Sequence, residues 1–188
     1  MNHLMIDLIN TSEKQSSPLC AIEAVFFEPS TGQIGKTFYY SIDIRKAQSL
    51  KGRLSIQTAF DWMKKDSHWR AEVMSATEAE EDVLCSLAAF IADNTCPRNA
   101  ALFVWFKDIP EKLVSLRYAV DRSEVSGIFP EGTKYRCIRS LLDLAAATDY
   151  APHARSALAR YTLTDARYQA EQVCEIWQRL TSPHIGSL

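Results

Sequence analysis

An aspartate lies within an apolar segment near the amino terminus of this chain. Asp7 is surrounded by Met5, Ile6, Leu8 and Ile9, and side chains of this kind favour a buried β-strand. A buried carboxylate costs free energy unless something pairs with it. The segment therefore predicts that another part of the chain supplies a partner for Asp7.

A second acid, Asp165, stands near the start of the last segment with helical periodicity, residues 162–180. Apolar residues recur there every three or four positions, which indicates a helix with one buried side. On this pattern alone, Asp165 is the acid of a capping box, Thr162-Leu163-Thr164-Asp165, at the helix start. Lysine and arginine side chains usually lie at the surface, and this is also the simplest expectation for Lys112 and Arg160.

The composition is typical of a globular chain. The 188 residues are 47% hydrophobic and 23% charged, and they can bury one sizeable core. We therefore expect a single domain over residues 1–180 and a flexible tail over 181–188. The formal net charge of −2 argues against a strong general attraction to nucleic acid, although it leaves room for a local basic patch.

The cysteines and the lengths of the apolar segments indicate in which cellular compartment the protein is expected. No apolar run approaches the roughly 20 residues that span a membrane, and Asp7 interrupts the first run where a signal peptide would need continuity. The cysteines are odd in number and never CxxC-spaced, which fits reduced thiols in the core rather than a metal site. We expect a cytoplasmic protein with no membrane association. The five cysteines are Cys20, Cys85, Cys96, Cys137 and Cys174.

The order of the predicted elements favours an α/β fold. Three strands come first, over residues 3–9, 20–28 and 34–44, with a turn at 29–32 that predicts an antiparallel meander. One further strand and five helices follow, and they pack against the sheet in this class of fold. They are helix 55–65, helix 76–94, strand 101–106, helix 109–120, helix 135–149 and helix 162–180.

Four stretches together resemble the DnaQ-like 3′-5′ exonucleases, the DEDDh group of the ribonuclease H-like superfamily. They are HLMIDL, AIEAVFFEPSTGQIG, LFVW and LTDARYQAEQVCEIWQ, and they run from His3 to about Trp177. The nearest branch is the short exonucleases and exoribonuclease-like proteins of prophages and mycobacteria. The resemblance implies a mixed five-stranded sheet in the order 3-2-1-4-5, flanked by helices, with a short fifth strand between helices 109–120 and 135–149.

The chemistry of that family uses four carboxylates and a histidine. The carboxylates hold two Mg²⁺ ions about 4 Å apart, and the histidine acts as a general base. Asp7 and Asp165 match the first and last aspartates. The resemblance places Ile9 at the glutamate position, Lys112 at the second aspartate and Arg160 at the histidine.

These replacements suggest that cations take the place of the metal ions. Four carboxylates balance two Mg²⁺, whereas Asp7 and Asp165 with Lys112 and Arg160 are neutral without metal. Pairing of this kind offsets the cost of burying the acids. The site is expected to be vestigial, with no cofactor.

Other residues leave two points open. Asp108, Glu111 or Glu23 could rebuild the lost carboxylates, in which case Mg²⁺ or Mn²⁺ would bind. Arg136 and Arg139 match an Arg-x-x-Arg stretch of the family, and they serve either the structure or phosphate contact.

Three functions are therefore considered. The first is a prophage-type exonuclease-like protein without catalysis, which binds a protein partner, a second copy of itself or nucleic acid. The second is an active or weakened metal-dependent exonuclease on DNA or RNA. The third is a nucleotide or single-strand binding module that uses Lys112 and Arg160 for phosphate.

Overall fold

The computed structural model describes residues 1–47, 56–65, 67–96, 101–147, 149–151, 153 and 165–181. The tail was expected over residues 181–188, but Thr181 is the last residue of a helix. Residues 182–188 lie outside the described residues, as do Arg160 and the three residues before Asp165. Among the described residues, no helix is long and apolar enough to cross a membrane.

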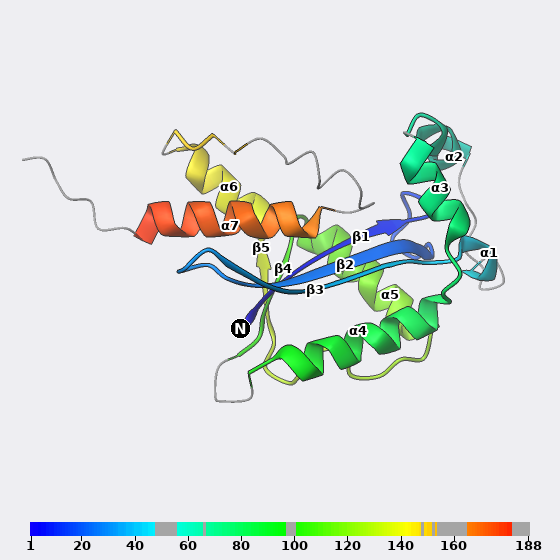
Figure 1. The fold of residues 1–188 in the computed structure, drawn as a ribbon, viewed down its shortest axis with the longest axis horizontal. Helices are drawn as coiled ribbons and strands as arrows, with labels where there is room; N and C mark the ends of the chain where they lie inside the picture. Colours follow the sequence, from blue (N-terminus) through cyan, green and yellow to red (C-terminus); the bar gives the residue numbers. More distant parts are fainter. Residues whose placement is uncertain are drawn as a thin grey trace, which may run out of the picture.

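A five-stranded mixed sheet forms the centre of the molecule (Figure 1). The strand order is β3-β2-β1-β4-β5, which confirms the expected order. The first three strands are antiparallel, and β4 and β5 run parallel to β1. The strands are β1 (His3–Asn10), β2 (Leu19–Glu28), β3 (Gln33–Ser41), β4 (Phe103–Phe106) and β5 (Lys134–Cys137).

Helices cover both faces of this sheet. In Figure 1, α6 and α7 lie on one face, and α4 and α5 lie on the other. A π-helical turn, η2, leads from β4 into α5. The helices are α1 (Ile44–Ala47), α2 (Ile56–Met63), α3 (Ser67–Ser75), α4 (Glu80–Asn94), η2 (Ile109–Leu113), α5 (Val114–Arg122), α6 (Ile138–Ala146) and α7 (Ala166–Thr181).

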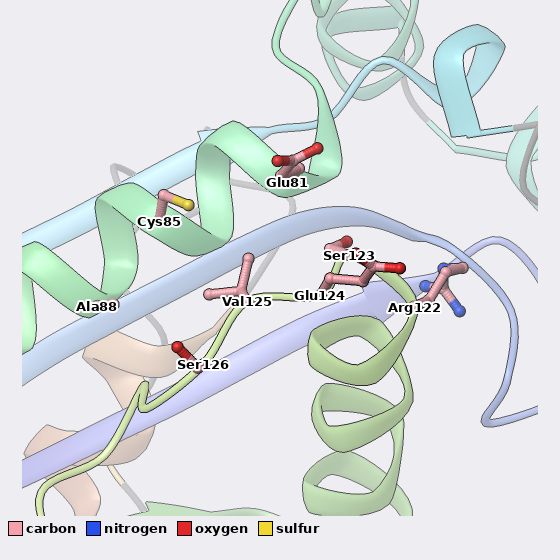
Figure 2. A pocket seen from close by; sticks show the side chains of 8 residues that line it. All are labelled: Glu81, Cys85, Ala88, Arg122, Ser123, Glu124, Val125 and Ser126. Atoms are coloured by element: carbon pink, nitrogen blue, oxygen red, sulfur yellow. The ribbon is translucent and has the colours of Figure 1, made fainter.

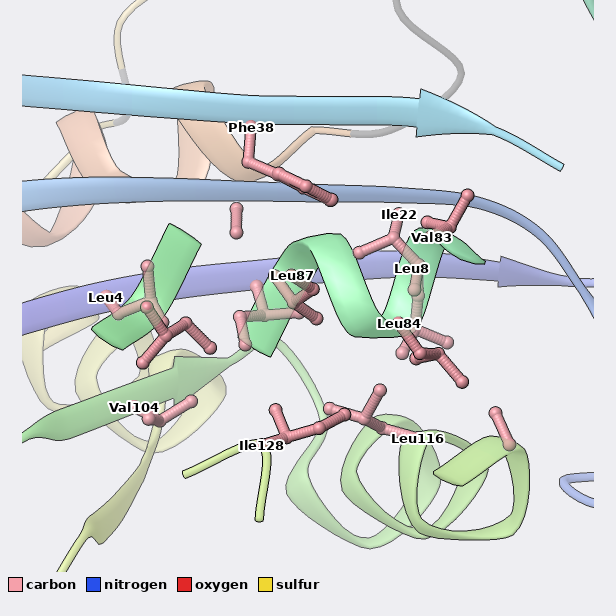
Figure 3. Close-up of a cluster of buried hydrophobic side chains, with 14 of the residues drawn as sticks. Leu4, Leu8, Ile22, Phe38, Val83, Leu84, Leu87, Val104, Leu116 and Ile128 are labelled. Carbon is pink, nitrogen blue, oxygen red and sulfur yellow. The ribbon is translucent and has the colours of Figure 1, made fainter. Parts of the chain in front are cut away.

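The alternation of β1 assigns its side chains to two cores. Leu4 and Leu8 join the larger core between the sheet and helices α4 and α5 (Figure 3). Met5 joins a second core with Trp105 and the inner side of α7. Because side chains of a strand alternate in direction, Asp7 points to the same face as Met5.

Three local features of the structure differ from the expectations. Residues 134–137 form β5 and α6 begins only at Ile138, whereas the periodicity predicted a helix over 135–149. Parallel pairing with β4 overrides the local helical pattern there. Residues 109–113 form a π-helical turn instead of the start of an α-helix, and α3 was not predicted.

Candidate functional site

Two carboxylates lie side by side on the sheet face beneath α7. Asp7 of β1 is directly opposite Glu23 of β2 in the antiparallel register. Both residues are buried, with 8% and 6% of their surface exposed. On the same face, Met5 packs in one apolar cluster and Ile9 packs against another, so the two acids form a polar strip between them.

Asp7 finds its partners on α7 and on the chain just before it. Its Oδ2 accepts a hydrogen bond from the backbone N–H of Asp165 at 3.0 Å and from the Gln169 side-chain amide at 3.3 Å. Its Oδ1 accepts one from the backbone N–H of Leu8 at 3.0 Å. The structure therefore brings together the two aspartates that matched the family.

Glu23 supports the same helix end. Its Oε2 accepts a hydrogen bond from the backbone N–H of Ala166, the first residue of α7, at 2.8 Å. The first N–H groups of a helix lack partners within the helix, and the helix dipole favours negative charge there. Asp7 and Glu23 thus act together as a cap for α7.

A lysine ammonium lies beside these acids. Lys112 Nζ is 3.8 Å from Asp7 Oδ1, and it donates a hydrogen bond to the Leu8 carbonyl at 2.8 Å. The η2 turn directly after β4 brings Lys112 to this position, where only 20% of its side chain is exposed. Lys112, which the resemblance places at the family's second aspartate, therefore points toward Asp7.

Ile9, which the resemblance places at the family's glutamate position, has a packing role. Ile9 is half-buried and packs against the cluster of Ala21, Trp69 and Val73. Trp69 and Val73 come from α3, whose existence the sequence patterns did not indicate. Ile9 therefore contributes to an apolar contact between the sheet and α3.

The other two acids that could rebuild a metal site have different surroundings from Asp7 and Glu23. Asp108 accepts a charge-assisted hydrogen bond from Arg139 at 2.7 Å, and Glu111 is exposed. Within the described residues, neither acid bonds to Asp7 or Glu23. Arg139 is thus paired with a carboxylate, and Glu23 is the acid that lies directly opposite Asp7.

Arg136 is enclosed by aromatic rings. Its guanidinium carbon lies 4.0 Å from the ring centre of Phe103, 5.2 Å from that of Trp105 and 5.6 Å from that of Trp177. Burial lowers the pKa of Arg136. Burial, and secondarily the charge of Arg136, lowers the pKa of His3 to about 4. These contacts give Arg136 a place in the packing of the α7 face.

Sequence patterns missed one further polar residue of the site. Gln169 is 4% exposed and its amide nitrogen donates to Asp7. It stands four positions after Asp165, which places both on one side of a helix, and that spacing was the available signal. Gln169 and Asp165 also line a cavity of about 50 Å³ with Lys107 and Tyr168.

A larger groove lies on the opposite face of the sheet. It has a volume of about 590 Å³ and runs between α4 and the segment after α5 (Figure 2). Glu81 and Cys85 form one wall, and Ser123 and Glu124 form the other. As far as the described residues define it, this groove contains none of the residues predicted for the site.

The donor set does not suit a pair of magnesium ions. Mg²⁺ needs near-octahedral oxygen coordination, usually with carboxylates whose oxygens are available to it. Here oxygens of Asp7 and Glu23 accept backbone N–H bonds, and the Lys112 ammonium is adjacent. In the described parts of the chain, no group of three or more His, Cys, Asp or Glu residues could hold a metal ion.

Solved structures with the same arrangement of sheet and helices are nucleases. The nuclease domain of 3′hExo, a DEDDh family member bound to rAMP, is similar with a TM-score of 0.63 at 13% identity, over 94% of this chain and 92% of that domain. A full-length 3′-exonuclease is similar with a TM-score of 0.60 at 12% identity, over 95% of this chain and 80% of that protein. The fold is therefore that of the DEDDh exonucleases.

The family model for the Rv2179c-like 3′-5′ exoribonuclease domain matches residues 2–177. The chain belongs to this family. Among curated proteins, no sequence matches it significantly.

Proposed function

We propose that this chain is an exonuclease-like protein without nuclease activity and that it acts by binding a protein partner. The observation that carries this proposal is the position of Lys112, whose ammonium lies 3.8 Å from Asp7 and bonds to the Leu8 carbonyl. A divalent cation next to that ammonium would meet strong repulsion, because like charges in a poorly solvated site interact strongly.

The use of the remaining acids supports the same conclusion. Asp7 and Glu23 accept the N–H groups of Asp165 and Ala166 at the start of α7. Withdrawing these acids to coordinate metal would leave those N–H groups without acceptors. Loss of a cap interaction typically costs about 0.5–2 kcal/mol, so metal binding and the observed helix end compete.

A weakened exoribonuclease is the second candidate, and Glu23 is the observation that favours it. Glu23 lies opposite Asp7 and is buried next to it, so it can stand in for the carboxylate lost at Ile9. The family's description as exoribonucleases makes single-stranded RNA the substrate for that case. A catalytic base would still be missing at position 160, where the chain has arginine.

The nature of the partner follows from charge. The formal net charge of −2 gives the chain no general attraction to nucleic acid. A protein partner is therefore favoured over RNA, and a prophage setting with a second copy or an active relative as partner is in keeping with the family resemblance.

A nuclease assay with matched variants tests the loss of activity. Labelled single-stranded RNA is incubated with the wild-type protein, with the Asp7→Asn/Asp165→Asn double variant, and with Asp108→Asn as a control for an acid outside the site. With Mg²⁺ or Mn²⁺ we expect the same background release from all three proteins. Sustained release by the wild type and Asp108→Asn that is absent from the double variant would establish the second candidate instead.

A further inference from the structure

The groove between α4 and the segment after α5 contains a serine hydroxyl without a partner. Ser123 lies on the wall of this groove, and only 9% of its surface is exposed. Its Oγ is buried and forms no hydrogen bond with the described residues. Because buried hydroxyls are almost always hydrogen-bonded, an unpartnered one beside a groove indicates a place for a ligand's polar group.

Two glutamates stand on opposite walls of the same groove (Figure 2). Glu81 lies in the first turn of α4, and Glu124 lies in the segment after α5. Both are exposed, and within the described part of the chain neither forms an ion pair. Arg122 also lines the groove, but its guanidinium is bonded to Glu80 and to the Ser16 carbonyl. The groove therefore offers two carboxylates that have no cation of their own.

The local backbone does not explain why residue 124 is a glutamate. Its φ is 53°, in the left-handed region that glycine and asparagine adopt most easily after the end of a helix. A glycine would hold this turn with less strain. Strained backbone of this kind is concentrated at functional positions, so the side chain of Glu124 is a candidate for a role outside the fold.

The rest of the groove lining is apolar or small. Ala88 and Val125 are half-buried, and Cys85 and Ser126 are exposed. An alkyl chain can lie against Ala88 and Val125 while a charged group at its end remains near the carboxylates. The volume of about 590 Å³ is sufficient for a long side chain together with a short piece of backbone.

The two segments that form the groove are strongly acidic. Residues 78–93 contain five Asp or Glu and no Lys or Arg, and residues 119–126 contain two acids and one base, Arg122. Charge of this sign attracts cations and repels the phosphates of nucleic acid. A metal ion is not the expected cation, because no group of three or more possible ligands occurs in the described residues.

We infer that this groove binds an arginine side chain of a protein partner, with its guanidinium between Glu81 and Glu124 and with Ser123 Oγ as a further acceptor. The inference rests on the proposed function, because it takes the occupant to be a protein, and it adds the location and chemistry of the contact. A guanidinium has five N–H donors in a plane and pairs strongly with carboxylates. Its alkyl stem would lie against Ala88 and Val125.

A peptide-binding experiment tests the inference. The probe is a fluorescein-labelled peptide of alternating glycine and arginine residues, and its neutral control has citrulline in place of arginine. Fluorescence anisotropy gives the dissociation constant for the full-length wild type and for the Glu81→Gln/Glu124→Gln variant. The matched control is Asp93→Asn/Glu131→Gln, which removes the same charge at two exposed positions outside the groove.

We expect the charge of the groove to determine the affinity. The dissociation constant should rise about tenfold or more for Glu81→Gln/Glu124→Gln and stay within about twofold for the control variant. Ser123→Ala should raise it about fivefold and leave the midpoint of thermal unfolding unchanged, because the Ser123 Oγ has no hydrogen bond in the described residues to lose. The citrulline peptide should not bind.

Cysteine alkylation locates the bound peptide. Cys85 lies on the groove wall, Cys96 lies just beyond the other end of α4, and both thiols are exposed. The arginine peptide should slow the alkylation of Cys85, followed by mass spectrometry, and leave the rate at Cys96 unchanged. Equal protection of the two cysteines would place the peptide elsewhere and overturn the inference.

Other outcomes would also overturn it. These are no binding of the arginine peptide, equal binding of the citrulline peptide, or equal losses of affinity in the two double variants. Tighter binding of spermine would assign the groove to a free polyamine, and self-association that Glu81→Gln/Glu124→Gln abolishes would assign it to a second copy. None of these results bears on nuclease activity. Release of nucleotides in the separate nuclease assay would overturn the proposed function and leave the measured affinity for arginine standing.

Discussion

Each face of the sheet buries an acid next to a cation, and the two pairs differ in construction. On the face covered by α4 and α5, Arg122 donates to both oxygens of Glu80 at 2.7 and 2.9 Å. On the face covered by α7, Lys112 Nζ stays 3.8 Å from Asp7 and gives its short hydrogen bond to a backbone carbonyl.

The difference extends to the surrounding contacts. Glu80 also accepts a bond from the Leu19 N–H at 2.8 Å, and Arg122 also donates to the Ser16 carbonyl at 3.0 Å. This pair therefore ties α4 and α5 to the start of β2. Both charged groups make several short hydrogen bonds, as is usual for a structural ion pair. Asp7 takes its hydrogen bonds mainly from backbone and amide groups, and its cation is a looser neighbour. This loose contact between Lys112 and Asp7 is what we expect if a cation stands where a metal ligand once stood.

The largest effect is expected on the α4–α5 face. Arg122→Ala leaves the Glu80 carboxylate buried without its cation, and breaking a buried pair from one side costs about 3–5 kcal/mol. The midpoint of thermal unfolding should fall by about 6–20 °C on the usual scaling for a chain of this size. Arg139→Ala is the control, because its pair with Asp108 is exposed and worth about 0–1 kcal/mol. Equal losses for both variants would contradict the structural role assigned to Arg122.

Removal of Lys112 should have a smaller effect. Lys112→Met keeps the alkyl chain but deletes the ammonium, so Asp7 loses its cation while its bonds from Asp165 and Gln169 remain. We expect a loss of about 1–3 kcal/mol in the free energy of unfolding, measured by urea denaturation. Lys36→Met, at an exposed position of β3, is the matched control. A change within error for Lys112→Met would show that the Lys112 ammonium contributes nothing to the site.

Added Mn²⁺ tests directly whether the α7 face still binds divalent metal. Millimolar Mn²⁺ should leave the unfolding midpoint of the wild type within about 1 °C, because a ligand stabilises only a protein that binds it. Lys112→Asp places a third carboxylate beside Asp7 and Glu23, so its midpoint should rise by several degrees with Mn²⁺ and return with EDTA. Lys36→Asp makes the same change of charge at an exposed position of β3, outside the site, and should not respond. A saturable rise in the wild type would mean that the site still binds metal.

The smallest effect at neutral pH is expected from His3 on the α7 face, because its contribution changes only as the pH falls below about 6.5. His3 has its pKa lowered to about 4, mainly by burial, so it is neutral in the folded protein between pH 4 and 6.5 while the unfolded chain takes up a proton. Stability from this group should therefore be complete above about pH 6.5 and decline as the pH falls toward 4.

The His3→Asn variant isolates that contribution. Asparagine keeps an acceptor near the position of Nδ1, which accepts a bond from the Trp105 indole at 3.1 Å. The difference in unfolding free energy between wild type and variant, followed from pH 4 to 7, should change in favour of the wild type as the pH rises. A difference that is constant with pH would rule out His3 as a source of the dependence.

Much of the fold followed from local patterns, and the failures have physical causes. The alternation in β1 and the helical stripe of α7 are strong signals, because each buries one side of a regular element. Residues 134–137 carry a weaker signal that was interpreted as helix, and pairing with β4 decided otherwise. The η2 turn depends on how the chain leaves β4, which no spacing of apolar residues indicates.

Within the site, the family resemblance pointed to Asp7 and Asp165 and marked Ile9 and Lys112 as departures from the family pattern. Glu23 was considered only as a substitute ligand, and its position opposite Asp7 depends on the register of two strands. Gln169 was not considered, although its spacing of four residues from Asp165 was the signal that could have identified it.

The amino-acid sequence by itself determined the family and, through the family resemblance, the order of the strands. The departures from the family pattern at Ile9 and Lys112 stay a prediction of that resemblance. Only the tertiary structure decided which group pairs with each charge: the start of α7 with Asp7 and Glu23, and the Lys112 ammonium with Asp7 and the Leu8 carbonyl. The physical reason is that the partner of a buried charge depends on which distant segments approach it and exclude water, and spacing along the chain carries no information about that approach.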